Sequence, residues 1–129
     1  MNADNKRLDG GTILLLEDEA FIGMAIREFL IAAGVDDVLH AFTVEDAHAL
    51  MRSNTFDAAI LDVRLPGGSN CYDIAVELAK HDVAIVFHSG HVQVEFLESF
   101  PNAVFCGKPA SPAKLVDALA RAQENLKVV

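Results

Sequence analysis

The chain has 129 residues, a net charge of −9 and a hydrophobic fraction of 52%, which fits one globular domain with a full core. The acidic balance argues against nucleic-acid binding, because phosphate backbones are bound by clustered lysine and arginine. The apolar runs are shorter than the roughly 20 residues of a membrane-spanning helix, and the N-terminus lacks the apolar segment of a signal peptide. We therefore expect a cytoplasmic domain at residues 12–129 that contacts no membrane, preceded by a flexible tail at residues 1–11.

Strand and helix patterns alternate five times along the chain. Apolar runs bounded by turn residues predict buried strands, and apolar residues at helical spacing predict helices. In chain order we expect a strand at 12–17, a helix at 20–33, a strand at 35–41, a helix at 43–52, a strand at 57–61, a helix at 71–80, a strand at 83–88, a helix at 91–98, a strand at 103–106 and a helix at 112–126. This alternation predicts an α/β fold with a parallel sheet and helices on both faces.

Capping residues support several of these helix boundaries. Gly34 is a C-cap candidate for the first helix. Thr43 is expected to cap the second helix, with Asp46 completing a capping box. Ser111 followed by Pro112 is typical of a helix start.

The aromatic residues and cysteines are expected to serve packing. Reduced thiols are the default for the two widely spaced cysteines, and Cys106 is expected in the core. The phenylalanines assigned to the core are Phe21, Phe29, Phe42, Phe56 and Phe87.

Four apolar runs each end in a reactive polar residue. These residues are the pair Glu17-Asp18, then Asp62, Ser89 and Lys108. In an open α/β sheet ligands bind outside the carboxyl ends of the strands, so the four positions are predicted to converge on one edge. Carboxylates at that edge suit Mg²⁺, and a hydroxyl with an ammonium suits a phosphoryl group.

Four motifs in this order resemble the receiver domains of two-component response regulators. They are Leu15–Glu19, Ile60–Gly67, Phe87–Gly90 and Cys106–Pro109, and the resemblance covers about residues 12–126. It implies a flavodoxin-like (βα)5 fold, a doubly wound five-stranded parallel sheet with strand order 2-1-3-4-5. The Phe-x-Ser-Gly pattern also resembles small receivers found near a subclass of alphaproteobacterial sensor kinases. The stretch between Ser89 and Lys108 is shorter than is common in the family.

The resemblance implies a role for each position around the phosphoryl group. Asp62 would be the phosphoacceptor, and Lys108 would neutralise the phosphoryl oxygens. Ser89 would bind a phosphoryl oxygen after transfer, and Phe105 would be the aromatic switch residue. The family often holds the bond before Pro109 in cis.

The resemblance also implies a Mg²⁺ cofactor. Asp18, Asp62 and the backbone carbonyl of Arg64 would contact the ion, and Glu17 would hold it through water. Arg64 and His91 would tune dephosphorylation. A zinc site at His88 and His91 is disfavoured, because no third ligand stands at helical spacing.

The implied function is that of a stand-alone response regulator, which is not an enzyme beyond its own phosphorylation and dephosphorylation. The phosphodonor would be a sensor histidine kinase or a histidine phosphotransfer protein. The output would be an unidentified protein, or a homodimer through the 91–126 face. A phosphorelay shuttle or phosphate sink remains an alternative.

Two other classes fit less well. A haloacid dehalogenase-type phosphatase needs an Asp two residues after its nucleophile, where this chain has Arg64. In a flavodoxin-like cofactor carrier, Glu17-Asp18 would repel the flavin phosphate.

Overall fold

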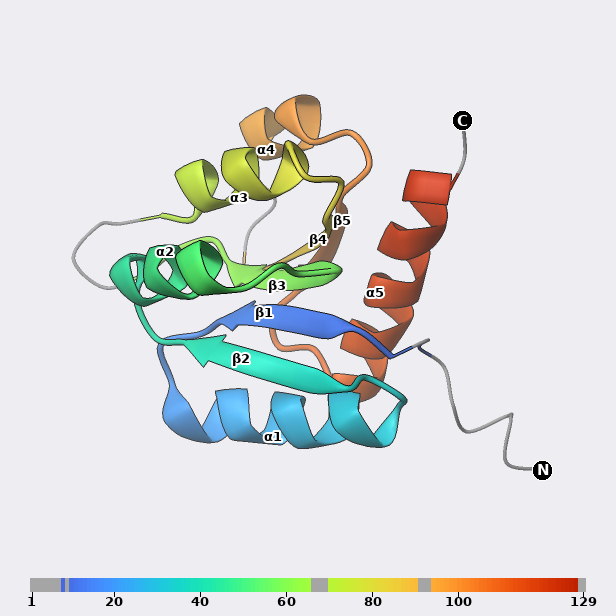
Figure 1. Cartoon of the computed structure of the whole chain (residues 1–129). Coiled ribbons are helices and arrows are strands. Elements are labelled where there is room, and N and C mark those ends of the chain that lie inside the picture. The colour runs from blue at the N-terminus through green and yellow to red at the C-terminus, as the bar shows by residue number, and fades with distance from the viewer. Residues whose placement is uncertain (1–7, 9, 66–69, 91–93, 128–129) are drawn as a thin grey trace.

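A computed structural model describes residues 8, 10–65, 70–90 and 94–127, and in these residues five strands alternate with five helices (Figure 1). The elements are β1 (Thr12–Leu16), α1 (Ala20–Ala32), β2 (Asp37–Ala41), α2 (Val44–Ser53), β3 (Ala58–Asp62), α3 (Tyr72–Ala79), β4 (Ala84–Ser89), α4 (Val94–Ser99), β5 (Val104–Gly107) and α5 (Pro112–Lys127). All strand pairs are parallel, in the order β2-β1-β3-β4-β5. The flavodoxin-like fold and its strand order are therefore confirmed.

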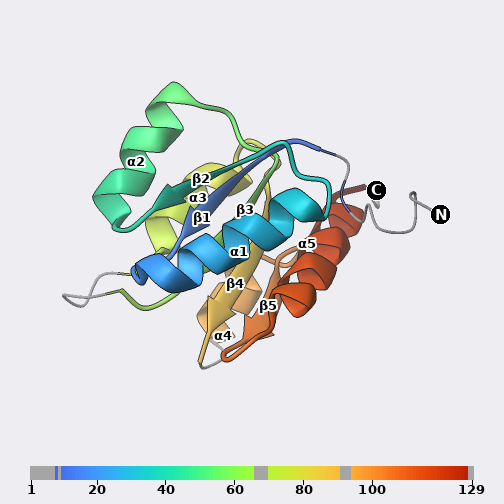
Figure 2. The ribbon, with the colours of Figure 1, turned by 90° about the horizontal axis from the view of Figure 1, so that it is seen from below.

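Helices cover both faces of the sheet. Helices α2, α3 and α4 lie on one face, and α1 and α5 lie side by side on the other (Figures 1 and 2). The central strands β3 and β4 are buried at every position, as their apolar composition requires. Two core clusters result, one under α1 and α5 that includes Leu15, Ile60, Val86 and Leu119, and one on the opposite face that includes Leu14, Leu61, Ile74 and Phe87.

The register of the sheet aligns the carboxyl ends of the inner strands. Leu16 pairs with Leu61 across β1 and β3, and Asp62 pairs with His88 across β3 and β4. Ser89 pairs with Gly107, the residue before Lys108. Polar residues that are far apart in the sequence therefore meet at one edge.

The side chains of Thr43 and Ser111 cap their helices as expected, but Asp46 bonds the N–H of Phe42 instead of that of Thr43. The Thr43 hydroxyl accepts a hydrogen bond of 3.0 Å from the Asp46 N–H, and the Asp46 carboxylate accepts one of 3.1 Å from the Phe42 N–H. Ser111 accepts a bond of 3.3 Å from the Lys114 N–H at the start of α5. Gly34 follows the C-cap of α1 with a φ of 120°, the left-handed region that favours glycine.

Most element boundaries lie within one residue of the sequence prediction, and the start of β2 differs by two. Strand β2 begins at Asp37 rather than residue 35, because Val35 still bonds back to Leu30 at the helix exit. Helix α4 begins at Val94, and residues 91–93 of the expected helix lie outside the described residues.

The prediction of a uniformly buried set of phenylalanines is wrong. Phe87 is fully buried, but Phe21 is 86% exposed, and Phe29 and Phe42 are about as exposed as buried. In α1 the buried positions are Gly23, Ile26 and Leu30. Because α1 is apolar around most of its circumference, its sequence did not reveal which side faces the core.

The packed part of the chain includes Leu8, which lies in the segment expected to be a tail. Leu8 is 3% exposed within the cluster under α1 and α5, and its N–H donates to the Ala33 carbonyl at 3.1 Å. The Gly10 N–H donates to the Gly34 carbonyl at 2.9 Å. These bonds satisfy carbonyl groups at the C-terminal end of α1. In the described residues, no helix is long and apolar enough to span a membrane.

Burial of Leu8 predicts that this residue stabilises the domain. Leu8→Ala should lower the free energy of unfolding by about 2 kcal/mol, because it removes buried methyl groups and leaves a cavity. Urea denaturation measures the change, and Leu97→Ala on α4, where the leucine is 40% exposed, is the matched control. Equal stability of Leu8→Ala and the parent protein would show that residue 8 contributes no packing.

Candidate functional site

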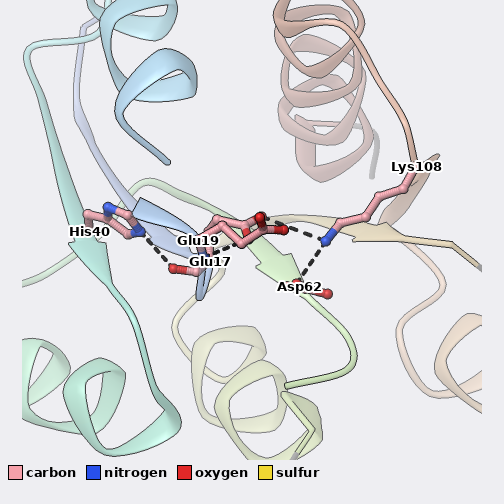
Figure 3. A network of polar contacts seen from close by, with 5 residues as sticks. All are labelled: Glu17, Glu19, His40, Asp62 and Lys108. Atoms are coloured by element: carbon pink, nitrogen blue, oxygen red, sulfur yellow. Dashed lines mark hydrogen bonds and ion pairs between the residues drawn. The ribbon is translucent and has the colours of Figure 1, made fainter. Parts of the chain in front are cut away.

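The carboxyl ends of the inner strands bring together the polar residues singled out in the sequence. Glu17 and Asp18 follow β1, Asp62 ends β3, Ser89 ends β4 and Lys108 follows β5. The turn after β1 is held by a 3.1 Å hydrogen bond from the Glu19 N–H to the Glu17 carboxylate (Figure 3). The predicted convergence on one sheet edge is therefore observed.

Lys108 lies between two of the carboxylates. Its Nζ donates to Asp62 Oδ2 at 2.8 Å and is 3.7 Å from Glu17 Oε1 (Figure 3). Its backbone N–H donates to the Ser89 carbonyl at 2.8 Å, and the bond between Lys108 and Pro109 is cis. The lysine is thus fixed at its backbone by β4 and at its ammonium by β1 and β3.

Burial and charge act against each other at this site. Glu17 and Asp62 are 1% and 5% exposed. Burial raises the pKa of Glu17, and the nearby Asp62 and Asp18 charges add to the shift, while the Glu19 N–H and Lys108 oppose it. Desolvation lowers the pKa of Lys108, but its hydrogen bond and charge interactions with Asp62 outweigh this effect, so that the pKa is raised overall.

The carboxylates fit a divalent cation. One oxygen from each of Glu17, Asp18 and Asp62 lies within 4.8 Å of the others, and among the described residues this is the one group with such geometry. Hard cations such as Mg²⁺ prefer carboxylate oxygens, and they relieve the repulsion between closely packed carboxylates. Burial is the main cause of the raised pKa of Glu17, and repulsion from Asp62 and Asp18 adds to it.

Ser89 and Phe105 lie on the β4 and β5 side of the site. Ser89 is 4% exposed. Phe105 is half-buried, and its ring packs on Phe87 with centroids 5.3 Å apart. Phe87 contacts Phe96 of α4 edge-on. The rings of Phe105, Phe87 and Phe96 therefore form one continuous aromatic group between β5 and α4.

Tyr72 at the start of α3 joins the same aromatic group. Its ring contacts Phe96 and Phe100, and its hydroxyl donates to Ser99 Oγ at 3.0 Å. Helices α3 and α4 are therefore linked by both packing and a hydrogen bond.

Of the two residues expected to tune dephosphorylation, only Arg64 lies in the described part of the chain. Arg64 is exposed, and its backbone pairs with Asn70 in an isolated bridge. His91 lies outside the described residues.

His88 is buried, and burial together with Lys108 lowers its pKa to about 4. Its Nε2 has no hydrogen-bond partner in the described part of the chain.

The cysteines behave as packing residues. Burial raises the pKa of Cys71 to about 12, and burial also raises the pKa of Cys106. Cys71 is fully buried, and Cys106 packs at the edge of the cluster under α1 and α5.

Sequence reasoning missed His40, which contacts the site from β2. Its Nε2 is 2.8 Å from the backbone oxygen of Glu17 (Figure 3). Strand alternation places His40 on the face covered by α1, as it does Val38. The one sequence signal for this contact is Gly23 of α1, because a glycine inside a helix leaves space for a neighbouring side chain such as the His40 ring.

A doubly wound sheet with three carboxylates and a lysine at its carboxyl edge defines a class of α/β domain that can bind a cation and an anion together. The model of the response regulator receiver domain family matches residues 13–120. The chain belongs to the response regulator receiver family. No curated protein matches the chain.

Solved structures of receivers are similar to the chain over most of its length. A response regulator receiver protein from Sinorhizobium medicae is 24% identical, with a TM-score of 0.78 over 90% of this chain and 96% of that one. SdrG from Sphingomonas melonis is 31% identical, with a TM-score of 0.67 over 90% and 97%. The non-phosphorylated HemR receiver domain from Leptospira biflexa is 31% identical, with a TM-score of 0.72 over 92% and 95%.

The raised pKa of Glu17 predicts a pH-dependent cost in the metal-free protein. The folded state holds the Glu17 proton to a higher pH than the unfolded state, so stability falls as pH rises above the usual glutamate pKa. Glu17→Gln removes this loss and should raise the free energy of unfolding at pH 7 by about 1 kcal/mol.

Chemical denaturation at several pH values, without divalent cations, measures the effect. Glu124→Gln, at an exposed position of α5, is the control and should change little. If Glu17→Gln instead loses stability at pH 7, the ion pair with Lys108 outweighs the cost of burying the carboxylate.

Proposed function

We propose that this receiver accepts a phosphoryl group on Asp62 from a histidine kinase or a histidine phosphotransfer protein. The single observation that carries the proposal is the 2.8 Å contact between Lys108 Nζ and Asp62 Oδ2 beside Glu17 and Asp18. An ammonium placed on the nucleophile also lies where the oxygens of an incoming phosphoryl group need a positive charge.

The reaction suits a carboxylate nucleophile. An oxygen of Asp62 forms a bond to phosphorus as the phosphorus–nitrogen bond of the phosphohistidine breaks, and the histidine nitrogen keeps the electron pair and takes up a proton. Charge spreads over the equatorial oxygens in the transition state, so the protein acts by positioning and charge neutralisation. Lys108 supplies a compact positive charge for that purpose.

Mg²⁺ is the cofactor that these residues fit. Asp18, Asp62 and the Arg64 carbonyl would contact the ion directly, and Glu17 would hold it through water. When bound, the ion would neutralise charge on the phosphoryl oxygens and draw the carboxylates together.

Phosphorylation would switch contacts on the face formed by α4, β5 and α5. Ser89 would be drawn toward the phosphoryl group, and the Phe105 ring would turn into the space behind it. The two arrangements need to differ by only a few kcal/mol for phosphorylation to shift their populations.

An output surface of its own is favoured over a role as a phosphate sink. Val94 and Leu97 are apolar residues of α4 that are 61% and 40% exposed. They give this face apolar area that a partner protein or a second copy of the chain can cover.

Asp62 is predicted to be the sole phosphorylation site. Incubation with acetyl phosphate and Mg²⁺ should add one phosphoryl group, detected by intact-protein mass spectrometry. Asp62→Ala should abolish the addition, because no other carboxylate contacts Lys108 so closely among the described residues. Asp73→Ala, which changes an exposed aspartate of α3, should leave it unchanged. Equal phosphorylation of Asp62→Ala and the parent protein would disprove the assignment.

The switching surface is tested by amide hydrogen exchange with and without beryllofluoride, a phosphoryl mimic. We expect changes of exchange at residues 94–107 and at the start of α5, with little change in α1. Changes confined to α1 would contradict this surface, and the Asp62→Ala variant shows which changes come from the mimic at Asp62.

A further inference from the structure

We propose that His40 is a positioning residue, which fixes the backbone of Glu17 and thereby holds the acidic pair Glu17-Asp18 facing Asp62. The inference rests on the proposed function, because it assigns a support to the same site. It concerns a residue of β2, an edge strand of the sheet, which supplies none of the carboxylates of the site.

The His40 ring completes the hydrogen bonding of Glu17 where the sheet ends. The Glu17 N–H donates to the Ala41 carbonyl at 3.0 Å, and the Glu17 carbonyl faces His40 Nε2 at 2.8 Å. Strand β1 ends at Leu16 and β2 ends at Ala41. Beyond these ends the ring, in place of a backbone N–H of the neighbouring strand, bonds to the Glu17 carbonyl. A carbonyl oxygen accepts only, so Nε2 carries the proton in this contact.

The ring itself is held by two neighbours. It stacks on Phe42, with centroids 4.0 Å apart and an angle of 24° between the planes. It also lies so close to Gly23 of α1 that a Cβ at this position would overlap three of its atoms. Glycine inside a helix costs about 1 kcal/mol relative to alanine, and here it leaves room for the imidazole.

Holding the Glu17 backbone matters because the carboxylates next to it repel one another. Glu17, Asp18 and Asp62 offer oxygens within 4.8 Å, and a backbone free to move would relieve the repulsion by spreading them. A cation site needs its ligands within about 0.5 Å of the productive geometry. His40 does not contact the reacting atoms, so it acts through the backbone of Glu17.

The first test titrates Mg²⁺ alone into the unphosphorylated protein. His40→Ala should weaken Mg²⁺ affinity about tenfold, as losses of residues that orient metal ligands do. His40→Gln keeps a donor near the position of Nε2 and should restore most of the affinity. His81→Ala, which removes an exposed histidine beside Glu77, should bind like the parent protein.

A double-mutant cycle tests the role of Gly23. Gly23→Ala should displace the ring and weaken Mg²⁺ binding in the parent protein. In the His40→Ala background the same change meets no ring and should have no further effect, because the two residues act as a unit. Additive losses would show that Gly23 acts independently of His40.

Amide exchange in the metal-free protein gives a readout that does not depend on the ion. His40→Ala and Gly23→Ala should speed exchange at Glu17 and Glu19, whose N–H groups bond to Ala41 and to the Glu17 carboxylate. Leu8→Ala is the control for lost stability without a change near the site.

Unchanged exchange at Glu17 and Glu19 in His40→Ala would overturn the proposal, as would equal effects of His40→Ala and Leu8→Ala on Mg²⁺ affinity. Failure of the proposed function gives a different result. The parent protein would then not be phosphorylated by acetyl phosphate, while the effects of His40→Ala on exchange and Mg²⁺ binding would persist.

Discussion

The contact between Lys108 and Asp62 is the interaction on which the site depends. The sheet places three carboxylates at one edge, two of them almost completely buried, and burying a charge without a partner is strongly unfavourable. Lys108 offsets this cost because its backbone is bonded to β4 while its ammonium reaches β1 and β3. Buried ion pairs contribute little net stability, so the arrangement is explained by the charge that it presents to a ligand.

Two other carboxylates, at the amino ends of the strands, differ from those of the site. Asp36 and Asp57 accept hydrogen bonds from the backbone N–H groups of Gly11 and Thr12 at 2.9 and 2.8 Å. A Cβ at Gly10 would lie 2.8 Å from the Asp36 carboxylate, and a Cβ at Gly11 would lie 2.7 Å from the Asp57 carboxylate. Among the described residues, Asp36 and Asp57 belong to no group of three possible ligands within 4.8 Å of one another, whereas Glu17, Asp18 and Asp62 form such a group. Geometry thus separates a structural carboxylate from one suited to binding.

The sequence was most informative where local chemistry and topology agree. The apolar runs that form β3 and β4 are buried on both faces, as expected for central strands of a parallel sheet. The residue that ends each run therefore falls at the carboxyl edge, where ligands bind. The helix starts at Thr43 and Ser111 were also predicted from the sequence, because hydroxyl side chains cap helices by accepting hydrogen bonds from nearby N–H groups.

Other features depend on contacts between distant parts of the chain. The sequence did not reveal which side of α1 faces solvent, because Phe21 and Phe29 on that side are as apolar as the residues that pack inward. Burial of Leu8 depends on a hydrogen bond to Ala33 at the far end of α1. His40 gains its role only when β2 lies beside β1 and α1 crosses above it, so periodicity within one segment carries no information about it.

The link between α3 and α4 has a practical consequence. The chain contains one tyrosine and no tryptophan, so Tyr72 is its only ordinary source of intrinsic fluorescence above that of phenylalanine. The phenol ring contacts Phe96 and Phe100, and its hydroxyl bonds to Ser99. Any displacement of α4 changes the polarity and hydrogen bonding around this fluorophore. The protein therefore carries an intrinsic optical reporter for α4, a helix of its proposed output surface, without labels or substitutions.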